Sequence, residues 1–158
     1  MPSISFPARE GKTAPHNRSY KPESNMEESP RKLILVVEDD VHLGKMLCAY
    51  LKRSGYDAEL AATGHDALDF CDVTCPAAVM ADVHLPDLNG LILTSKLRQK
   101  FGKAMPIIVL SGDTSMEVIR SLSHVGATHF FNKPLNLDNL RQHLSDLLSG
   151  TAVSADCP

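Results

Sequence analysis

Two kinds of hydrophobic pattern alternate along the chain from residue 31 onward. Short unbroken apolar runs, of which Leu33–Val37 is the clearest, are typical of strands covered on both faces in a parallel sheet. Between these runs, apolar residues recur every three or four positions, as in Leu43, Met46 and Leu47, which is the spacing of one face of an amphipathic helix. The alternation predicts five strands and five helices within residues 31–149.

The predicted strands occupy residues 33–37, 56–61, 77–81, 106–110 and 128–131. The predicted helices are one that stops at Gly55, then residues 64–71, 90–101 and 114–124, and a last helix from Leu137 that ends at Gly150. Parallel strands joined by right-handed helical crossovers form a doubly wound α/β sheet with helices on both faces. Periodicity does not determine the order of the strands.

The two ends of the chain lack this pattern. Residues 1–30 hold five of the ten prolines and five serines without an apolar period, which predicts a disordered tail. A docking role for this tail and a translation start at Met26 are open alternatives. Residues 31–149 are predicted to form one domain, followed by a short tail over residues 150–158.

Composition narrows the class of protein. Hydrophobic residues make up 43% of the chain and charged residues 22%, near the average for globular proteins, and the net charge of -3 argues against a nucleic-acid binder. The chain shows neither a long apolar run for a membrane span nor a secretory signal. Its four cysteines lack zinc or disulfide spacing and are interpreted as free thiols (Cys48, Cys71, Cys75 and Cys157). We expect a cytoplasmic protein without direct membrane or nucleic-acid contact.

Polar side chains follow four of the predicted strands. Glu38 and Asp39 follow the first strand, Asp82 the third, Ser111 the fourth and Lys133 the fifth. Because parallel strands end at one edge of a sheet, we expect these side chains to converge. Carboxylates about 4 Å apart repel by roughly 4 kcal/mol per pair at an effective dielectric near 20, so the cluster needs a cation. Oxygen ligands of this kind suit Mg²⁺.

Together, these five positions resemble the receiver domain of two-component response regulators, and the resemblance covers residues 31–149. It implies a flavodoxin-like five-stranded parallel sheet with the strand order 2-1-3-4-5. Since residues 150–158 are too few for an output domain, we expect a stand-alone, single-domain regulator.

The resemblance also implies a chemistry. Asp82 would be the phosphoacceptor, which takes a phosphoryl group as an aspartyl phosphate. Mg²⁺ would be bound by Asp39 and Asp82, by Glu38 largely through water, and by the backbone carbonyl of His84. Lys133 would neutralise the charge that grows on the phosphoryl oxygens.

Further positions match the family's switch. Ser111 would bond a phosphoryl oxygen, and Phe130 matches the aromatic residue that rotates when the loop after the fourth strand moves. His84 and Asp113 stand where side chains flank the path of a hydrolytic water, so we expect them to set the lifetime of the phosphorylated state. The Lys133-Pro134 bond matches one that is typically cis in receivers.

Each assignment has a structural alternative. Asp39 is an alternative cap for the first helix, although we assign that role to Asp40. Ser111 is alternatively a turn hydroxyl, Lys133 a surface charge and Phe130 a core residue. The remaining histidines, which include His65, show no metal spacing and are interpreted as surface residues.

We therefore expect a phosphoacceptor in two-component or phosphorelay signalling, not an enzyme beyond its own phosphorylation and dephosphorylation. The phosphoryl donor would be a sensor histidine kinase or a histidine phosphotransfer protein. Output would pass to a protein target through the face of the fourth helix, fifth strand and fifth helix; homodimerisation on phosphorylation is left open. The alternatives are a phosphorylation-independent pseudo-receiver adaptor and a phosphohydrolase, which would usually have a second Asp where His84 stands.

Overall fold

Five parallel strands form one sheet in the computed structural model, which describes residues 29–150. The strands are β1 (Leu33–Val37), β2 (Asp57–Ala61), β3 (Ala78–Asp82), β4 (Ile107–Ser111) and β5 (His129–Asn132). Their order in the sheet is β2-β1-β3-β4-β5, which confirms the predicted order. The direction of winding reverses between β1 and β3, and ligands of such sheets bind at the carboxyl ends of the strands beside this point.

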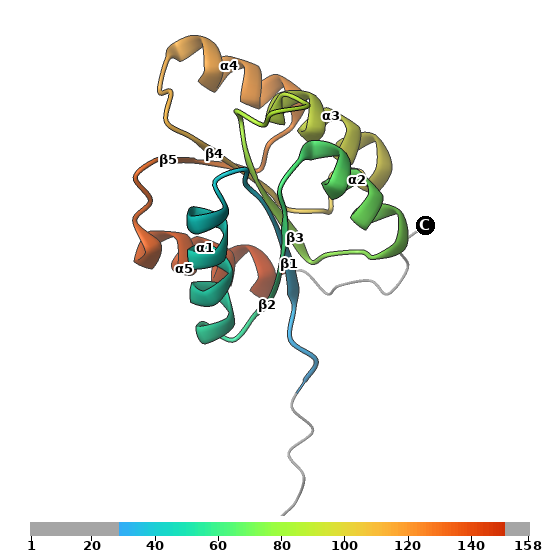
Figure 1. The fold of residues 1–158 in the computed structure, drawn as a ribbon, viewed down its shortest axis with the longest axis vertical. Coiled ribbons are helices and arrows are strands. Elements are labelled where there is room, and N and C mark those ends of the chain that lie inside the picture. Colours follow the sequence, from blue (N-terminus) through green and yellow to red (C-terminus); the bar gives the residue numbers. More distant parts are fainter. Residues whose placement is uncertain (1–28, 151–158) are drawn as a thin grey trace, which may run out of the picture.

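Helices cover both faces of the sheet. They are α1 (Val41–Arg53), α2 (Gly64–Val73), α3 (Gly90–Phe101), α4 (Met116–Val125) and α5 (Leu137–Ser149). Figure 1 shows α1 and α5 on one side of the sheet and α2, α3 and α4 on the other. The predicted doubly wound α/β fold is therefore confirmed.

The three inner strands are almost wholly buried. Every residue of β3 and β4 is buried, and in β1 only Leu33 is partly exposed. Alternate residues of β1 face opposite sides, so Val36 joins the cluster under α1 and α5 while Val37 joins the cluster under α2, α3 and α4. Helices on both faces explain why these strands have unbroken apolar sequences. The outer strands β2 and β5 are only partly buried.

Tertiary pairing and caps move some boundaries from their predicted positions. Strands β3 and β4 each extend to the polar residue that follows the apolar run, because Asp82 pairs with Leu110 in the ladder and Ser111 pairs with Asn132. Helix α4 begins two residues later than predicted, since Ser115 caps it. Asp40 caps α1 as predicted. Hydrogen bonds from two backbone N–H groups of α1 lower the pKa of Asp40.

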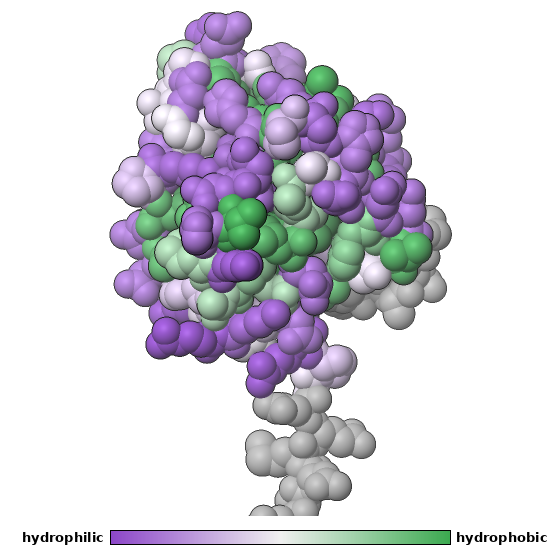
Figure 2. All heavy atoms as spheres, viewed as in Figure 1, coloured by the Kyte–Doolittle hydropathy of each residue, from purple (hydrophilic) through white to green (hydrophobic). Residues whose placement is uncertain are grey.

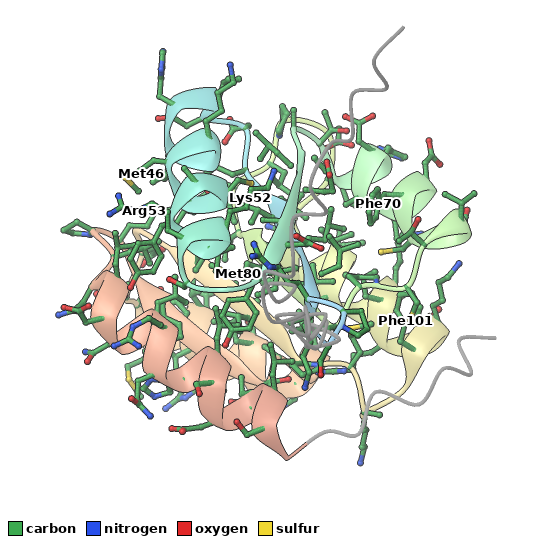
Figure 3. The ribbon with its side chains drawn as sticks, turned by 90° about the horizontal axis from the view of Figure 1, so that it is seen from below. Met46, Lys52, Arg53, Phe70, Met80 and Phe101 are labelled. Carbon is green, nitrogen blue, oxygen red and sulfur yellow. The ribbon has the colours of Figure 1, made fainter. Side chains whose placement is uncertain are left out.

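One position of the apolar stripe on α1 is not in the core. Met46 is 44% exposed, so its predicted place on the buried face is wrong. Figure 3 shows Met46 and Arg53 on the outside of α1, whereas Met80 lies at the centre of the molecule. Hydrophilic residues cover most of the face in Figure 2, and hydrophobic ones show among them near α1. The buried face of α1 instead carries Leu47 and Leu51.

The cysteine prediction holds only in part. Cys48 and Cys71 are buried free thiols, and burial raises the pKa of Cys71 to about 11. The prediction is wrong for Cys75, which is disulfide-bonded. Cys157 lies outside the described residues, as do nearly all residues of both predicted tails. Within residues 29–150, the structure contains no helix with the length and apolar character that crossing a membrane requires.

Candidate functional site

Three carboxylates meet at the carboxyl edge of the sheet. Glu38 follows β1 directly, Asp39 is the next residue, and Asp82 ends β3. One oxygen from each lies within 4.8 Å of the others. Glu38 is 1% exposed and Asp82 6% exposed, whereas Asp39 is exposed to solvent. Burial, together with the nearby charge of Asp82, raises the pKa of Glu38.

Lys133 joins two of these carboxylates. Its Nζ lies 2.7 Å from Oε2 of Glu38 and 2.6 Å from Oδ2 of Asp82. Burial opposes the charged ammonium, but the hydrogen bonds to Asp82 and Glu38 outweigh it and raise the pKa of Lys133. The backbone N–H of Lys133 donates to the carbonyl of Ser111 at 2.9 Å, and the Lys133-Pro134 bond is cis, as the resemblance implied. Lys133 is therefore a member of the site and not an isolated surface charge.

Ser111 lies at the same edge and is fully buried. Its Oγ accepts the N–H of Asp113 at 3.0 Å and donates to the Asp113 carbonyl at 3.2 Å. The carboxylate of Asp113 accepts the N–H of Ser115 at 2.8 Å, next to the start of α4. The Ser111 hydroxyl therefore closes the first turn of the β4–α4 loop (residues 112–115), which was the structural alternative for this residue.

The β3–α3 loop (residues 83–89) follows the central carboxylate. The N–H of His84 donates to Oδ1 of Asp82 at 3.0 Å, while the His84 side chain is exposed. The N–H of Gly90 returns to the carbonyl of Val83 at 2.8 Å and closes the loop. A Cβ at Gly90 would overlap the Asp82 carbonyl oxygen and lie 2.8 Å from Cα of Val83, so only glycine fits there without a shift.

Asp87, in the same loop, was not among the site residues predicted from the sequence, whereas its partner His65 lies on the surface as predicted. Asp87 accepts the backbone N–H groups of Gly64 and His65, each at 2.9 Å, and also contacts the His65 ring. The His65 side chain is exposed, but it has this specific neighbour. No local pattern connects Asp87 with a helix that begins 23 residues earlier, as the separation of the bonded pair shows.

Phe130 lies on β5 opposite Val109 of β4. It is partly buried and packs against the cluster that includes Val109 and Leu122. This position agrees with the core interpretation of the residue.

The donor atoms at this edge fit a hard divalent cation. Carboxylate oxygens are the ligands that Mg²⁺ takes, usually one or two with several waters. The Lys133 ammonium pairs with Glu38 and Asp82 but not with the third carboxylate, Asp39, which is exposed beside them. The cluster could therefore hold a divalent cation such as Mg²⁺.

Comparison with known proteins agrees with this geometry. The family model described as the response regulator receiver domain matches residues 34–145. The chain belongs to this family. Its receiver-domain relatives include the transcriptional regulatory protein ZraR of Salmonella typhimurium, 35% identical over 118 residues, which are 75% of this chain and 26% of that protein. The response regulator MprA of Mycolicibacterium vanbaalenii is 38% identical over 119 residues, which are 75% of this chain and 51% of MprA.

Solved receiver structures share the fold. A CheY-like receiver domain protein from Methanospirillum hungatei superposes with a TM-score of 0.72 at 28% identity, over 75% of this chain and 94% of that one. The chemotaxis protein CheY4 of Vibrio cholerae gives a TM-score of 0.70 at 30% identity, over 75% and 99%. The chain thus matches whole receiver domains but spans only about a quarter to a half of the curated relatives named above.

Proposed function

We propose that Asp82 is the phosphoacceptor of a two-component or phosphorelay pathway. The observation that carries this proposal is the ion-paired arrangement around Asp82, in which Lys133 donates to Oδ2 while the backbone of His84 donates to Oδ1. These two bonds fix the orientation of the Asp82 carboxylate at the carboxyl edge of the sheet. The family membership of the chain supports the same role.

A phosphoryl group would pass from a nitrogen or oxygen atom of the donor to a carboxylate oxygen of Asp82. A carboxylate oxygen of Asp82 attacks the phosphorus, and the donor leaves with the electron pair of its broken bond. Lys133 stabilises the negative charge on the phosphoryl oxygens from its position beside Oδ2 of Asp82. Glu38, Asp39 and Asp82 would hold Mg²⁺ together with the His84 carbonyl, and the ion supplies further charge neutralisation.

The β4–α4 loop and strand β5 would respond to the phosphoryl group. We propose that the Ser111 hydroxyl exchanges its bonds to Asp113 for a bond to a phosphoryl oxygen, which draws the β4–α4 loop inward. Phe130 would then turn into the space that the loop leaves. The expected output is a changed surface on α4, β5 and α5, to which a protein target binds.

His84 and Asp113 would tune the lifetime of the phosphorylated state. His84 is exposed two residues after Asp82, and Asp113 is exposed two residues after Ser111. Replacing either with alanine should change the rate of dephosphorylation, measured by the decay of the phosphorylated mass after the donor is removed. Unchanged rates in both variants would refute this role.

The phosphoryl donor would be a histidine kinase or a histidine phosphotransfer protein, and we expect the chain to act in the cytoplasm. The domain bounds 31–149 and homodimerisation on phosphorylation also stay predictions.

Intact mass spectrometry tests the proposal. The wild type, Asp82→Asn and Asp66→Asn are incubated with Mg²⁺ and acetyl phosphate, since Asp66 is an exposed carboxylate on α2 that serves as a matched control. We expect the mass of one phosphoryl group to be added to the wild type and Asp66→Asn but not to Asp82→Asn. No adduct on folded wild type, and no beryllofluoride binding, would instead favour a phosphorylation-independent adaptor.

A further inference from the structure

The β3–α3 loop is attached to the rest of the molecule at both of its ends. At its start, Val83 donates to the Leu110 carbonyl at 3.0 Å, and His84 donates to Asp82. At its end, Gly90 donates to Val83, and the side chain of Asn89 caps α3 by accepting the N–H of Leu91 at 2.8 Å. These bonds fix where the loop leaves β3 and where it enters α3, but not its middle.

The middle of the loop is attached to α2 through Asp87. The two carboxylate oxygens of Asp87 accept the N–H groups of Gly64 and His65, the first two residues of α2, and one oxygen also contacts Nδ1 of His65. A carboxylate in this place satisfies N–H groups that have no partner within the helix and faces the positive end of the helix dipole. Such charge-assisted bonds are stronger than neutral ones.

Close packing accompanies these bonds. Leu88, the neighbour of Asp87, lies against the start of α2, where a Cβ on Gly64 would come within 2.8 Å of Leu88 Cδ2. Two residues after Leu88, Gly90 at the start of α3 leaves no room for a side chain against the backbone of Asp82 and Val83. The loop is therefore held between α2 and the strand that carries the phosphoacceptor, and a shift at one contact displaces the other.

We propose that Asp87 is a positioning residue for the magnesium site, because its bonds to the start of α2 hold the loop that presents His84 to Asp82. This inference rests on the proposed function, and it adds a coupling between α2 and the site. When Asp87 is removed, the middle of the loop loses its attachment to α2, and the His84 carbonyl is positioned only by the bonds at the start of the loop. By reciprocity, Mg²⁺ binding should stabilise the start of α2, because any ligand stabilises the contacts that it requires.

Two measurements test this coupling. The first is the Mg²⁺ affinity of the unphosphorylated protein by calorimetric titration, for the wild type, Asp87→Ala, Asp87→Asn and Asp66→Ala. Asp66→Ala is the matched control, because Asp66 is an exposed acidic residue in the same first turn of α2. The second is hydrogen exchange at the amides of Gly64 and His65, with and without Mg²⁺.

We expect Asp87→Ala to bind Mg²⁺ about tenfold more weakly, in the range seen when a residue that orients a metal ligand is lost. Asp87→Asn keeps one acceptor oxygen and should fall between Asp87→Ala and the wild type, and Asp66→Ala should bind as the wild type does. Mg²⁺ should slow amide exchange at Gly64 and His65 in the wild type and in Asp66→Ala, but not in Asp87→Ala.

The possible failures are distinguishable. Equal Mg²⁺ affinity in folded Asp87→Ala and wild type, with only a lower melting temperature in the variant, would overturn the positioning role and leave a structural one. If Asp87→Ala does not fold, the Mg²⁺ affinity and melting temperature of Asp87→Asn are compared with those of the wild type instead. A wild type that binds no Mg²⁺ and gains no phosphoryl mass would overturn the proposed function and this inference together.

Discussion

The two loops that border Asp82, the proposed phosphoacceptor, are built differently. The β3–α3 loop is bonded to Asp82, to α2 and to its own two ends, and glycines at positions 64 and 90 let neighbouring backbones approach it closely. The β4–α4 loop has mostly exposed residues, and a Cβ added at Gly112 would meet nothing within 4 Å. The β3–α3 loop, with the proposed metal ligand His84, is thus held by its surroundings, whereas the β4–α4 loop, which we expect to move, has room to do so.

A methyl group added at the end of the β3–α3 loop and in the β4–α4 loop should show the largest difference in stability between the two. Gly90→Ala places a Cβ against the backbone of Asp82 and Val83, so we expect a loss of about 3 kcal/mol in unfolding free energy from overpacking. Gly112→Ala meets open space and should change stability by less than about 0.5 kcal/mol. Urea unfolding of both variants measures this. Equal losses would mean that the two loops are equally constrained.

Lys133 contacts the residue that precedes each of the two loops. Its ammonium bonds to Asp82, and its backbone N–H donates to the carbonyl of Ser111. Lys133→Met removes the ammonium and keeps the backbone bond. We expect phosphorylation by acetyl phosphate to slow about a hundredfold, the size of effect seen when one donor to a developing negative charge is lost. The rate is followed by mass spectrometry at saturating Mg²⁺.

The matched control for this variant is Lys100→Met, because Lys100 pairs with Asp72 on the surface of α2 and α3, away from the site. It should load at the wild-type rate. A normal rate in Lys133→Met would show that the ammonium is a structural counter-ion only.

Ser111→Ala tests the looser loop. The substitution removes the two bonds between the hydroxyl and the backbone of Asp113, and we expect a loss of about 1 kcal/mol in unfolding free energy. Loading of Asp82 should continue, whereas the change that beryllofluoride causes in the amide spectrum of α4 should be smaller than in the wild type. An unaltered spectral change would argue against a switch role for this hydroxyl.

Asp87 gives the smallest expected effect, and it depends on pH. Burial disfavours the charged carboxylate, but hydrogen bonds from Gly64 and His65 outweigh it and hold the pKa of Asp87 below its ordinary value. The contribution of Asp87 to stability is therefore complete above the unfolded-state pKa, about 3.9, and is lost as the pH falls through the lower folded-state pKa.

The melting temperatures of the wild type and Asp87→Asn should consequently differ at neutral pH and converge as the pH falls below about 4. Thermal unfolding across this range measures the difference. A gap that stays constant into strong acid would show that charge on Asp87 is not what holds the loop to α2.

The pattern of apolar runs was sufficient to predict the five strands, the five helices and the edge of the sheet where the polar residues meet. An inner strand covered on both faces must be apolar throughout, and an outer helix must be apolar on one face. The local sequence is therefore enough to predict the burial of Leu33–Val37 and of Leu47. The polar residues Asp82 and Ser111 that follow such runs were recognisable for the same reason, although the ladders that include them were not.

Other features depend on contacts between distant parts of the chain, and only the tertiary structure decides them. Met46 has the spacing of a core residue but faces outward, because the packing of α1 on the sheet selects which apolar positions are buried. The bonds of Asp87 to α2 span 23 residues, and those of Lys133 to Glu38 span 95. Residue type and local spacing determine which elements form and which groups are available, whereas the distances between those groups arise only when the strands are paired and the helices packed.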